Sequence, residues 1–252
     1  MSTTGDNEVI RTLLAHRSIR KFKPDPVTDE QLNLIVAAAQ AASTSSNIQA
    51  YTVIGITDPE RRQRFAELTG NQRHVAECPL FLIWCADLHR LELAVQGQGE
   101  QEMHQNMETL LLATVDASLA AQNAAVAAES LGLGIVYIGG IRNNPDAVVT
   151  ELGLPSLSYP LFGMCVGVPD QSPDKRPRLP LEAVYAHDAY PSDAKLKEQV
   201  EKYDDELSGY YAVRSGGART SNWSIEMASR LKENNLRGHM AEHLTKQGFK
   251  LK

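Results

Sequence analysis

Five consecutive residues near the N-terminus, His16-Arg17-Ser18-Ile19-Arg20, combine an imidazole, two guanidinium groups and a hydroxyl. An arginine side chain is a planar fork of donors that suits an oxyanion. In extended geometry Arg17 and Arg20 project to opposite sides of the chain, so they would bind two different parts of one anionic ligand. The segment is either such an anion site or a solvated basic cluster.

Two helices are predicted on either side of this cluster. Apolar residues at helical spacing indicate a short amphipathic helix over residues 7–15, which ends at the cluster. A second helix begins after Thr28, because Thr28 and Gln31 form a capping box. It ends at Ser43-Thr44-Ser45-Ser46-Asn47, where the hydroxyls favour local backbone hydrogen bonds. This polar segment is either a simple loop or a set of donors and acceptors facing a polar heterocycle.

The middle of the chain alternates predicted strands and helices. Apolar and β-branched runs predict strands at 51–56, 80–85, 135–138 and 161–168. Proline at the first helical position marks two helices, starting at Pro59 and Pro145. A polar stretch over residues 90–105, predicted to be mobile, precedes an alanine-rich helix over 103–131, roughly 40 Å long. A helix of this length and composition is expected to be central, packed on all sides or along a subunit interface.

Two glycine motifs flank the predicted strand at 135–138. Gly132-Leu133-Gly134 follows a helix and precedes a strand, which is the wrong context for a dinucleotide-binding fingerprint. Gly139-Gly140 lies at the strand end, where absent side chains would let backbone N–H groups approach a flat ligand. A plain turn is the alternative interpretation.

Two further pairs of arginines occur in the C-terminal third. Arg176 and Arg178 flank Pro177, which holds the chain extended and splays the two guanidinium groups in a way that suits a phosphate. Arg214 and Arg219 bracket a loop that contains two glycines, and this loop is either a flexible clamp or a solvated linker. Beyond residue 191 the chain is polar, with helices predicted over 196–211 and from 223 to the end. This part is expected to wrap a body formed elsewhere.

Composition excludes several classes of protein. The chain has 252 residues, 42% hydrophobic and 22% charged, as in a soluble globular protein of one large or two small domains. A net charge of −6 argues against a broad nucleic-acid surface. The sequence contains no signal-peptide pattern and no uninterrupted apolar run of about 18 residues, so we expect no membrane partner. The three cysteines lack metal spacing and indicate buried thiols in a reducing, cytoplasmic compartment.

The sequence lacks side chains for demanding covalent chemistry. It contains no G-x-S-x-G, no H-E-x-x-H and no Cys/His grouping with zinc spacing. His104, His187, His239 and His243 have no evident partners and are interpreted as surface or structural residues. His239 and His243 have i, i+4 spacing, but no third ligand is evident, so no metal is predicted. If the protein is an enzyme, a cofactor must supply the chemistry, and FMN fits the cations, donors and exposed backbone described above.

Five segments of the chain, taken in sequence order, resemble the nitroreductase family. The resemblance is specifically to its NADPH-dependent, FMN-containing nitro/flavin reductase branch. The segments are His16–Arg20, Ser45–Gln49, Gly70–His74, Tyr137–Asn144 and Lys175–Arg178, within a resemblance that spans about residues 7–250. The resemblance implies an α+β fold, an α/β/α sandwich with a mostly antiparallel central sheet, and an intertwined homodimer with FMN at the subunit interface. It also implies an FMN-binding core over 1–190 and a helical extension over 191–252.

The resemblance assigns roles to individual residues. His16, Arg17 and Ser18 would hold the phosphate and ribityl end, joined by Arg176 and Arg178 at the phosphate. Arg20 would face N1 and the C2 oxygen, where reduction places negative charge. Thr44 and Gln72 would bond the pyrimidine edge, and Ser45 and Gln49 are further implied FMN contacts. The segment formed by Tyr137, Ile138, Gly139 and Gly140 would run along the dimethylbenzene and N5 region. The family usually has lysine in place of Arg176 and serine in place of Thr44, and the chemistry of both groups is retained.

The implied activity is hydride transfer from NADPH to flavin N5, followed by electron transfer to nitroaromatics, quinones, free flavins or azo compounds in a ping-pong sequence. Arg214 and Arg219 would take the 2′-phosphate of NADPH. Two other interpretations stay open. One is a dehalogenase or flavin-fragmenting enzyme on the same fold, and the other is a non-catalytic flavin-binding carrier or sensor, which has no need of an NADPH clamp.

Overall fold

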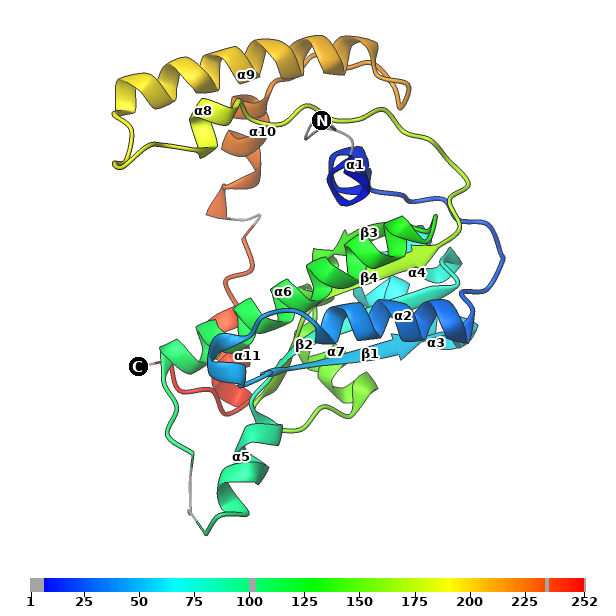
Figure 1. Ribbon diagram of the computed structural model, residues 1–252, viewed down its shortest axis with the longest axis vertical. Helices are drawn as coiled ribbons and strands as arrows, with labels where there is room; N and C mark the ends of the chain where they lie inside the picture. Colours follow the sequence, from blue (N-terminus) through cyan, green and yellow to red (C-terminus); the bar gives the residue numbers. More distant parts are fainter. Residues whose placement is uncertain (1–6, 100–102, 234–235, 252) are drawn as a thin grey trace. The chain divides into compact units, whose positions relative to one another are not determined.

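The computed structural model describes residues 7–99, 103–233 and 236–251. The chain divides into two compact units, of which unit 1 comprises Met1–Ser172 and His239–Lys252 and unit 2 comprises Pro173–Gly238 (Figure 1). The division falls before the expected boundary at residue 190, and the last residues return to unit 1. They return because Phe249 is buried against Tyr159, with ring centroids 5.6 Å apart, and the Gln247 carbonyl accepts a hydrogen bond from the Leu157 N–H.

Unit 1 is built on a four-stranded sheet. Its strands are β1 (Tyr51–Ile56), β2 (Leu80–Asp87), β3 (Gly134–Ile138) and β4 (Ser158–Gly167). They lie in the order β1-β2-β4-β3, and each neighbouring pair is antiparallel. The predicted strands and the antiparallel sheet are confirmed, and β2 and β4 extend beyond the predicted apolar runs.

Strand β2 shows how the sheet is covered on both faces. Alternate residues Leu80, Leu82 and Trp84 pack with α2 (Asp29–Gln40) and α6 (Met107–Ser130). The intervening Phe81, Ile83 and Cys85 pack with residues of α3 (Pro59–Leu68), α4 (Arg73–Glu77) and α7 (Pro145–Leu152). Because side chains of a strand alternate between faces, an unbroken apolar run requires helices on both sides. The three-layer α/β/α arrangement is therefore confirmed.

Helix α6 is the central helix of unit 1 and runs beside α2 (Figure 1). It begins at Met107, later than the expected residue 103, because Asn106 and Thr109 form a capping box. Its buried face is mostly alanine, which lets the helix approach the sheet closely. By length and composition alone it is apolar enough to cross a membrane, but 44% of that stretch is buried inside the protein, as in a core helix. Leu111, Val115 and Leu119 form an exposed apolar stripe on the opposite side.

Two shorter helices complete the N-terminal part of unit 1. Helix α1 (Glu8–Ala15) is capped by Asn7, and all its apolar side chains stay outside the core. The stretch 90–105, expected to be mobile, begins instead as α5 (His89–Gln96). The carboxylate of Asp87, one residue before the N-cap Leu88, accepts a hydrogen bond from the His89 N–H at 3.0 Å. Residues 100–102 of that stretch lie outside the described part of the chain.

Unit 2 contains α8 (Leu181–Val184), α9 (Asp193–Val213) and α10 (Trp223–Arg230). Its small core is formed by Tyr203, Leu207 and Tyr211 of α9 together with Trp223. The expected helix over 196–211 is confirmed and is longer than predicted, because Ser192 caps its start. The expected single helix from 223 to the chain end is wrong. Its second part, α11 (Met240–Lys246), belongs to unit 1 and is separated from α10 by a segment containing Gly238.

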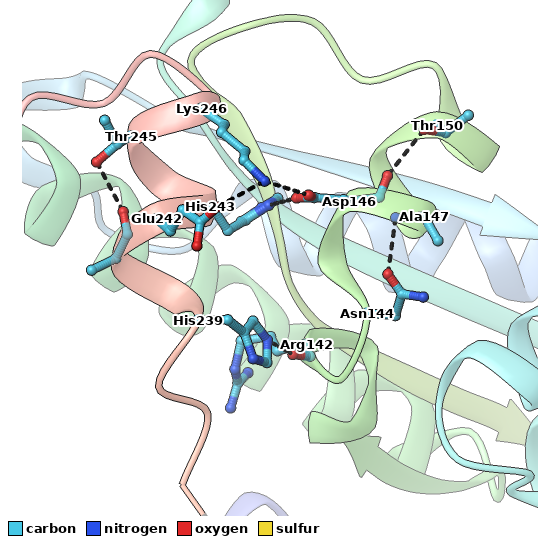
Figure 2. Close-up of polar contacts among 11 residues, drawn as sticks. Arg142, Asn144, Asp146, Ala147, Thr150, His239, Glu242, His243, Thr245 and Lys246 are labelled. Atoms are coloured by element: carbon cyan, nitrogen blue, oxygen red, sulfur yellow. Dashed lines mark hydrogen bonds and ion pairs between the residues drawn. The ribbon is translucent and has the colours of Figure 1, made fainter.

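Helix α11 is attached to the first turn of α7 by charged groups, as Figure 2 shows. The ring of His243 is buried and its Nδ1 lies 2.5 Å from Asp146 Oδ1, while Lys246 Nζ lies 3.2 Å from Asp146 Oδ2. His239 Nε2 lies 3.0 Å from the carbonyl oxygen of Arg142. Both histidines are therefore structural, as expected, but they do have partners. Within the described residues, no group of three possible metal ligands is present.

We expect the Asp146 contacts to make stability depend on pH. Hydrogen bonding to His243 is the main cause that lowers the pKa of Asp146, and Lys246 adds to it. A carboxylate with a lowered pKa stabilises the fold above its unfolded value of about 3.9, and this contribution is lost as pH falls through the folded pKa. Because the side chain is 54% exposed, Asp146→Asn should reduce the free energy of unfolding at pH 7 by at most about 1 kcal/mol.

Urea unfolding at pH 7 and pH 3 tests this prediction. The difference between Asp146→Asn and wild type should be smaller at pH 3 than at pH 7, because the contribution falls as the pH approaches the lowered pKa of Asp146. Asp25→Asn, an exposed loop carboxylate without an ion pair among the described residues, should show no difference at either pH. A loss of equal size at both values would mean that the carboxylate charge of Asp146 is not what stabilises the contact.

Candidate functional site

The segment from Ser18 to Lys23 is extended and runs along the edge of the sheet. The Ile19 N–H donates to the Ile135 carbonyl at 2.8 Å, and the Lys23 N–H donates to the Val168 carbonyl at 2.9 Å. The Ile19 side chain is buried, so Ser18 and Arg20 on either side of it project away from the core. The extended geometry expected for the basic cluster is therefore present. It follows from the backbone hydrogen bonds of Ile19 to β3 and of Lys23 to Val168, the residue after β4.

His16 and Arg17 are held by residues distant in the sequence. His16 Nδ1 lies 2.6 Å from Glu129 Oε1, near the C-terminal end of α6. If Nδ1 carries the proton, it donates to this carboxylate, and Nε2 is the ring nitrogen left for a ligand. Arg17 Nη1 donates to Ser172 Oγ at 3.1 Å, and Arg17 also lines an open hollow of about 600 Å³ beside α1. His16 and Arg17 thus both lie near the C-terminal end of α6.

Arg20 is the exposed cation of the cluster. Through its side chain it makes no hydrogen bond or ion pair with any other residue that the structure describes. Burial lowers the pKa of His74, and the Arg20 guanidinium lowers it further, so this imidazole is neutral at pH 7. His74 Nε2 is buried without a hydrogen-bond partner in the described chain. Arg20 therefore lies near the start of α4, immediately after Gln72, and its donors remain available for an anionic ligand.

Gln72 and the Gly139-Gly140 turn, far apart in the sequence, lie against each other. Gln72 Nε2 donates to the Thr69 carbonyl at 2.8 Å. A Cβ built on Gly140 would lie 2.4 Å from both Gln72 Nε2 and the Thr69 carbonyl oxygen. The absence of a side chain at Gly140 is thus explained by packing inside the protein. A Cβ on Gly139 would meet only Arg142 Nη2 at 3.7 Å, so Gly139 is the glycine with an open side.

The two residues before this turn have different surroundings. Ile138 is buried in the core beside α3 and α4, which leaves only its backbone for a ligand. The Tyr137 ring packs edge-on against Phe162 at 5.2 Å between centroids, and its hydroxyl donates to Gln122 Oε1 at 3.5 Å. Burial raises the pKa of Tyr137 well above its usual value. Tyr137 therefore stays neutral and supports the sheet face that carries α6.

The Ser/Thr segment forms a constrained loop against the N-terminal half of α6. The buried carboxylate of Asp116 accepts hydrogen bonds from the Ser45 N–H at 3.1 Å and the Ala50 N–H at 3.0 Å. Three residues in this loop have left-handed backbones, namely Ser46 (φ 47°), Asn47 (φ 59°) and Gln49 (φ 54°). Such conformations are unfavourable and persist where the surroundings impose them.

The sequence patterns did not identify Asp116 as a functional residue. A single carboxylate within the alanine-rich stretch of α6 was the feature that could have indicated it. The hydroxyl of Thr44, just before the loop, makes no hydrogen bond to another described residue. It is therefore available to a ligand, as the sequence analysis expects. Gln49 instead donates to the Asn47 carbonyl at 3.2 Å and lies within its own loop.

One copy of the chain does not bring the two groups of predicted FMN residues together. His16 is bound to Glu129 and the Ser45 backbone to Asp116, and these two positions are roughly 20 Å apart along α6 at 1.5 Å per residue. The loop also leads into β1, at one edge of the sheet, whereas the His16–Arg20 segment follows β3 at the other edge. Thr44, Ser45 and Gln49 therefore lie away from His16 within one subunit.

Unit 2 carries the two remaining pairs of arginines. Arg176 and Arg178 are exposed on either side of Pro177, whose carbonyl accepts a hydrogen bond from the Tyr203 hydroxyl at 2.9 Å. This hydrogen bond attaches the segment around Pro177 to α9. Neither guanidinium group forms an ion pair with another described residue. The rigid, splayed pair expected from the sequence is consistent with this geometry.

Arg214 and Arg219 converge on one aromatic ring. Arg219 Cζ lies 4.1 Å from the centroid of the Tyr211 ring and Arg214 Cζ lies 5.5 Å from it. Arg219 Nη2 is 3.1 Å from Glu226 Oε1, and Arg214 Nε donates to the Gly217 carbonyl at 2.8 Å. The loop is therefore structured by cation–π contacts and is more than a solvated linker. Glu226 was not singled out by the sequence.

Comparisons with known proteins match nearly the whole chain. The model of the nitroreductase family matches residues 13–168, and that of the nitroreductase family C-terminal domain matches residues 176–252. The FMN reductase (NADPH) of Bacillus subtilis is 41% identical over 96% of this chain and 98% of its own length. The oxygen-insensitive NADPH nitroreductase of Salmonella typhimurium is 44% identical over 95% and 97%.

Solved structures agree with this assignment. The structure described as the hypothetical oxidoreductase YcnD from Bacillus subtilis superposes with a TM-score of 0.94 at 40% identity. The match covers 98% of this chain and 99% of the YcnD chain. The NADPH:FMN oxidoreductase from Vibrio harveyi, complexed with NAD⁺, gives a TM-score of 0.87 at 39% identity, with coverage of 96% and 99%. The full length of the chain, both family models and the fold thus lead to one conclusion: the chain belongs to the nitroreductase family.

Proposed function

We propose that the protein is an FMN-dependent oxidoreductase that uses NADPH to reduce nitroaromatics, quinones, free flavins or azo compounds by a ping-pong mechanism. The observation that carries this proposal is the exposed Arg20 guanidinium, which has no ion pair among the described residues and lies close enough to His74 to lower its pKa. Gln72, two residues before His74, packs against the Gly139-Gly140 turn. Relatives that are named FMN reductase (NADPH) and oxygen-insensitive NADPH nitroreductase support it at 41% and 44% identity.

The residues present fit FMN. Arg20 and Arg17 provide cationic donors, the turn at Gly139 leaves backbone accessible, and the Thr44 hydroxyl has no other use among the described residues. In unit 2, Arg176 and Arg178 offer two exposed cations, neither in an ion pair within the described part of the chain, of the kind that suits a phosphate. Bound FMN would accept the hydride and deliver the electrons, chemistry that none of these side chains provides.

The chain's own residues would bind the cofactor and favour its reduced form. Arg20 would place a fixed positive charge where negative charge develops on reduction. His74 is neutral at pH 7, so it adds no competing charge beside that guanidinium. His16, oriented by Glu129 through Nδ1, would present Nε2 to the phosphate or ribityl end. The Ser/Thr loop would supply hydrogen bonds to the polar edge.

We infer that two copies of the chain complete each site. In one copy the loop at Thr44 lies against the N-terminal half of α6 and the cluster at His16 lies at its C-terminal end. A second copy with its α6 antiparallel to the first would place its loop beside the cluster. The exposed apolar stripe of α6, including Val115 at 52% exposure, suits such a contact. The exposed apolar side chains of α1 offer a second apolar surface. Sedimentation should give twice the chain mass of 27.7 kDa.

The three buried, unpaired cysteines support a cytoplasmic location, where thiols stay reduced. A spectrum of the purified protein tests the proposed function directly. We expect flavin absorption that is bleached without oxygen by NADPH at lower concentrations than by NADH, and recovered on addition of a quinone or nitroaromatic compound. Protein that takes up no FMN would contradict the cofactor assignment. Flavin that is bleached by neither nucleotide would instead favour a carrier.

A further inference from the structure

The Arg214–Arg219 loop of unit 2 contains two guanidinium groups and contacts two carboxylates, those of Glu226 and Asp174, and Asp174 accepts a hydrogen bond from the Ser215 N–H at 2.6 Å. Arg214 and Arg219 both lie over the Tyr211 ring, at 5.5 Å and 4.1 Å. Arg219 is bound by Glu226 at 3.1 Å, whereas the Arg214 side chain donates to a backbone carbonyl, that of Gly217. Among the described residues Arg214 has no carboxylate partner. Of the two guanidinium groups, that of Arg219 is thus paired with a carboxylate, whereas that of Arg214 is held by a backbone carbonyl in the described part of the chain.

The Glu226 carboxylate is held in place from two sides. Its Oε1 accepts a hydrogen bond from Ser221 Oγ at 2.7 Å, and the same oxygen lies 3.1 Å from Arg219 Nη2. The Ser221 hydrogen bond and the Arg219 charge lower the pKa of Glu226, so the group is ionised at neutral pH. The Arg219 backbone N–H also donates to the Tyr211 carbonyl at 2.9 Å. Both partners of the ion pair are therefore positioned before any nucleotide binds.

We propose that Glu226 is a specificity-determining residue that limits the preference for NADPH over NADH. Its carboxylate occupies donors of Arg219 that a 2′-phosphate would use, so binding of the phosphate must displace or share this contact. A phosphate also carries close to two negative charges and is repelled by a fixed carboxylate. A ligand without the 2′-phosphate meets neither cost. This inference rests on the proposed function, in which the Arg214–Arg219 segment binds NADPH.

Other features of the loop agree with an Arg219–Glu226 contact that a 2′-phosphate can replace. Gly217 has a left-handed backbone (φ +99°), a conformation that glycine adopts readily, and an added Cβ there would meet no other atom within 4 Å. The side chains of Arg219 and Glu226 are 40% and 19% exposed, so the ion pair is reached from solvent. Exposed ion pairs are weak, and a dianion competes well with a monoanion for one guanidinium.

The test measures binding of two probes to the FMN-loaded protein by calorimetry. Adenosine 2′,5′-bisphosphate represents the NADPH end and adenosine 5′-monophosphate the NADH end, and neither reduces the flavin. Glu226→Gln removes the charge and keeps the shape and the oxygen that accepts from Ser221. We expect it to tighten binding of the bisphosphate about fivefold, with the monophosphate changed less than twofold. The gain should shrink at 0.5 M salt, because exposed charges are screened.

Glu206→Gln, which removes an exposed carboxylate from α9 in the same unit, is the matched control and should change neither affinity. Unchanged bisphosphate binding in Glu226→Gln would overturn the inference, and weaker binding would do so too, because Glu226 would then act by orienting Arg219. Arg219→Ala separates the two levels of the argument. If wild type shows no preference for the bisphosphate, or if Arg219→Ala keeps that preference, the loop is not the nucleotide site and the proposed function fails at this point.

Discussion

Replacing Arg20 with alanine should lower reductase turnover about a hundredfold and shift the flavin midpoint potential downward. Arg20 is exposed, lacks an ion pair within the described residues and lies close enough to His74 to lower its pKa. Its positive charge is therefore available to stabilise the extra negative charge of the reduced cofactor. For a two-electron couple, each tenfold loss of this stabilisation corresponds to about 30 mV. Spectroelectrochemistry of the FMN-loaded variant measures that shift independently of turnover.

Two further variants show whether charge or geometry matters at this position. Arg20→Lys keeps the charge but not the planar fork. Its flavin midpoint potential should therefore stay close to that of wild type, while its FMN affinity should decrease. Lys21→Ala removes the neighbouring exposed cation, which projects to the other side of the extended segment, and should leave both quantities unchanged. A midpoint potential that is identical in Arg20→Ala and wild type would remove Arg20 from the proposed mechanism.

Replacing Asp116 with alanine should reduce the free energy of unfolding by about 3 kcal/mol. The carboxylate is fully buried and accepts hydrogen bonds from the N–H groups of Ser45 and Ala50, which would otherwise lack partners inside the protein. Without it, the left-handed backbones at Ser46, Asn47 and Gln49 lose the group that imposes them. Urea unfolding measures the stability, and calorimetry measures the accompanying loss of FMN affinity.

The isosteric Asp116→Asn variant separates the carboxylate from the space it fills. It keeps one acceptor oxygen and presents an NH₂ group to the second backbone N–H, so its stability should lie between those of Asp116→Ala and wild type. Ser118→Ala, on the same helix, loses only a hydrogen bond to the Thr114 carbonyl within α6 and serves as the control. Equal stability of Asp116→Ala and Ser118→Ala would contradict a special role for Asp116.

The same variants test whether the site is shared between two copies. If the cluster of one subunit meets the loop of the other, a mixed dimer of Arg20→Ala and Asp116→Asn contains one intact site and one doubly altered site. Co-expressed, differently tagged subunits should then recover up to half of the wild-type activity, above that of either variant alone. If each subunit forms its own site, both sites of the mixed dimer carry one change and no recovery occurs.

The strands and most helix starts of unit 1 were predictable because they depend on short-range patterns. The fully apolar run at Leu80–Cys85 requires a strand covered on both faces, and the sandwich provides this. Capping by Thr28 with Gln31 and by Asn144 before Pro145 occurs within a few residues, so the helix starts follow from local chemistry. The break between α10 and α11 was not predicted. The position of α11 depends on the contact between His243 and Asp146, about a hundred residues earlier, which no local pattern indicates.

By itself, the sequence determined which residue types are present for an anionic flavin and nucleotide, where most strands and helices form, and which family the motifs resemble. Only the tertiary structure decided which of those residues have partners. Asp116 meets Ser45 across 71 residues and Glu129 meets His16 across 113, and such contacts follow from packing and not from spacing. The same holds for Gly140, whose missing side chain makes room for Thr69 and Gln72. Glu226 beside Arg219 lies only a few residues away, yet it is the loop folding back over Tyr211 that creates this contact.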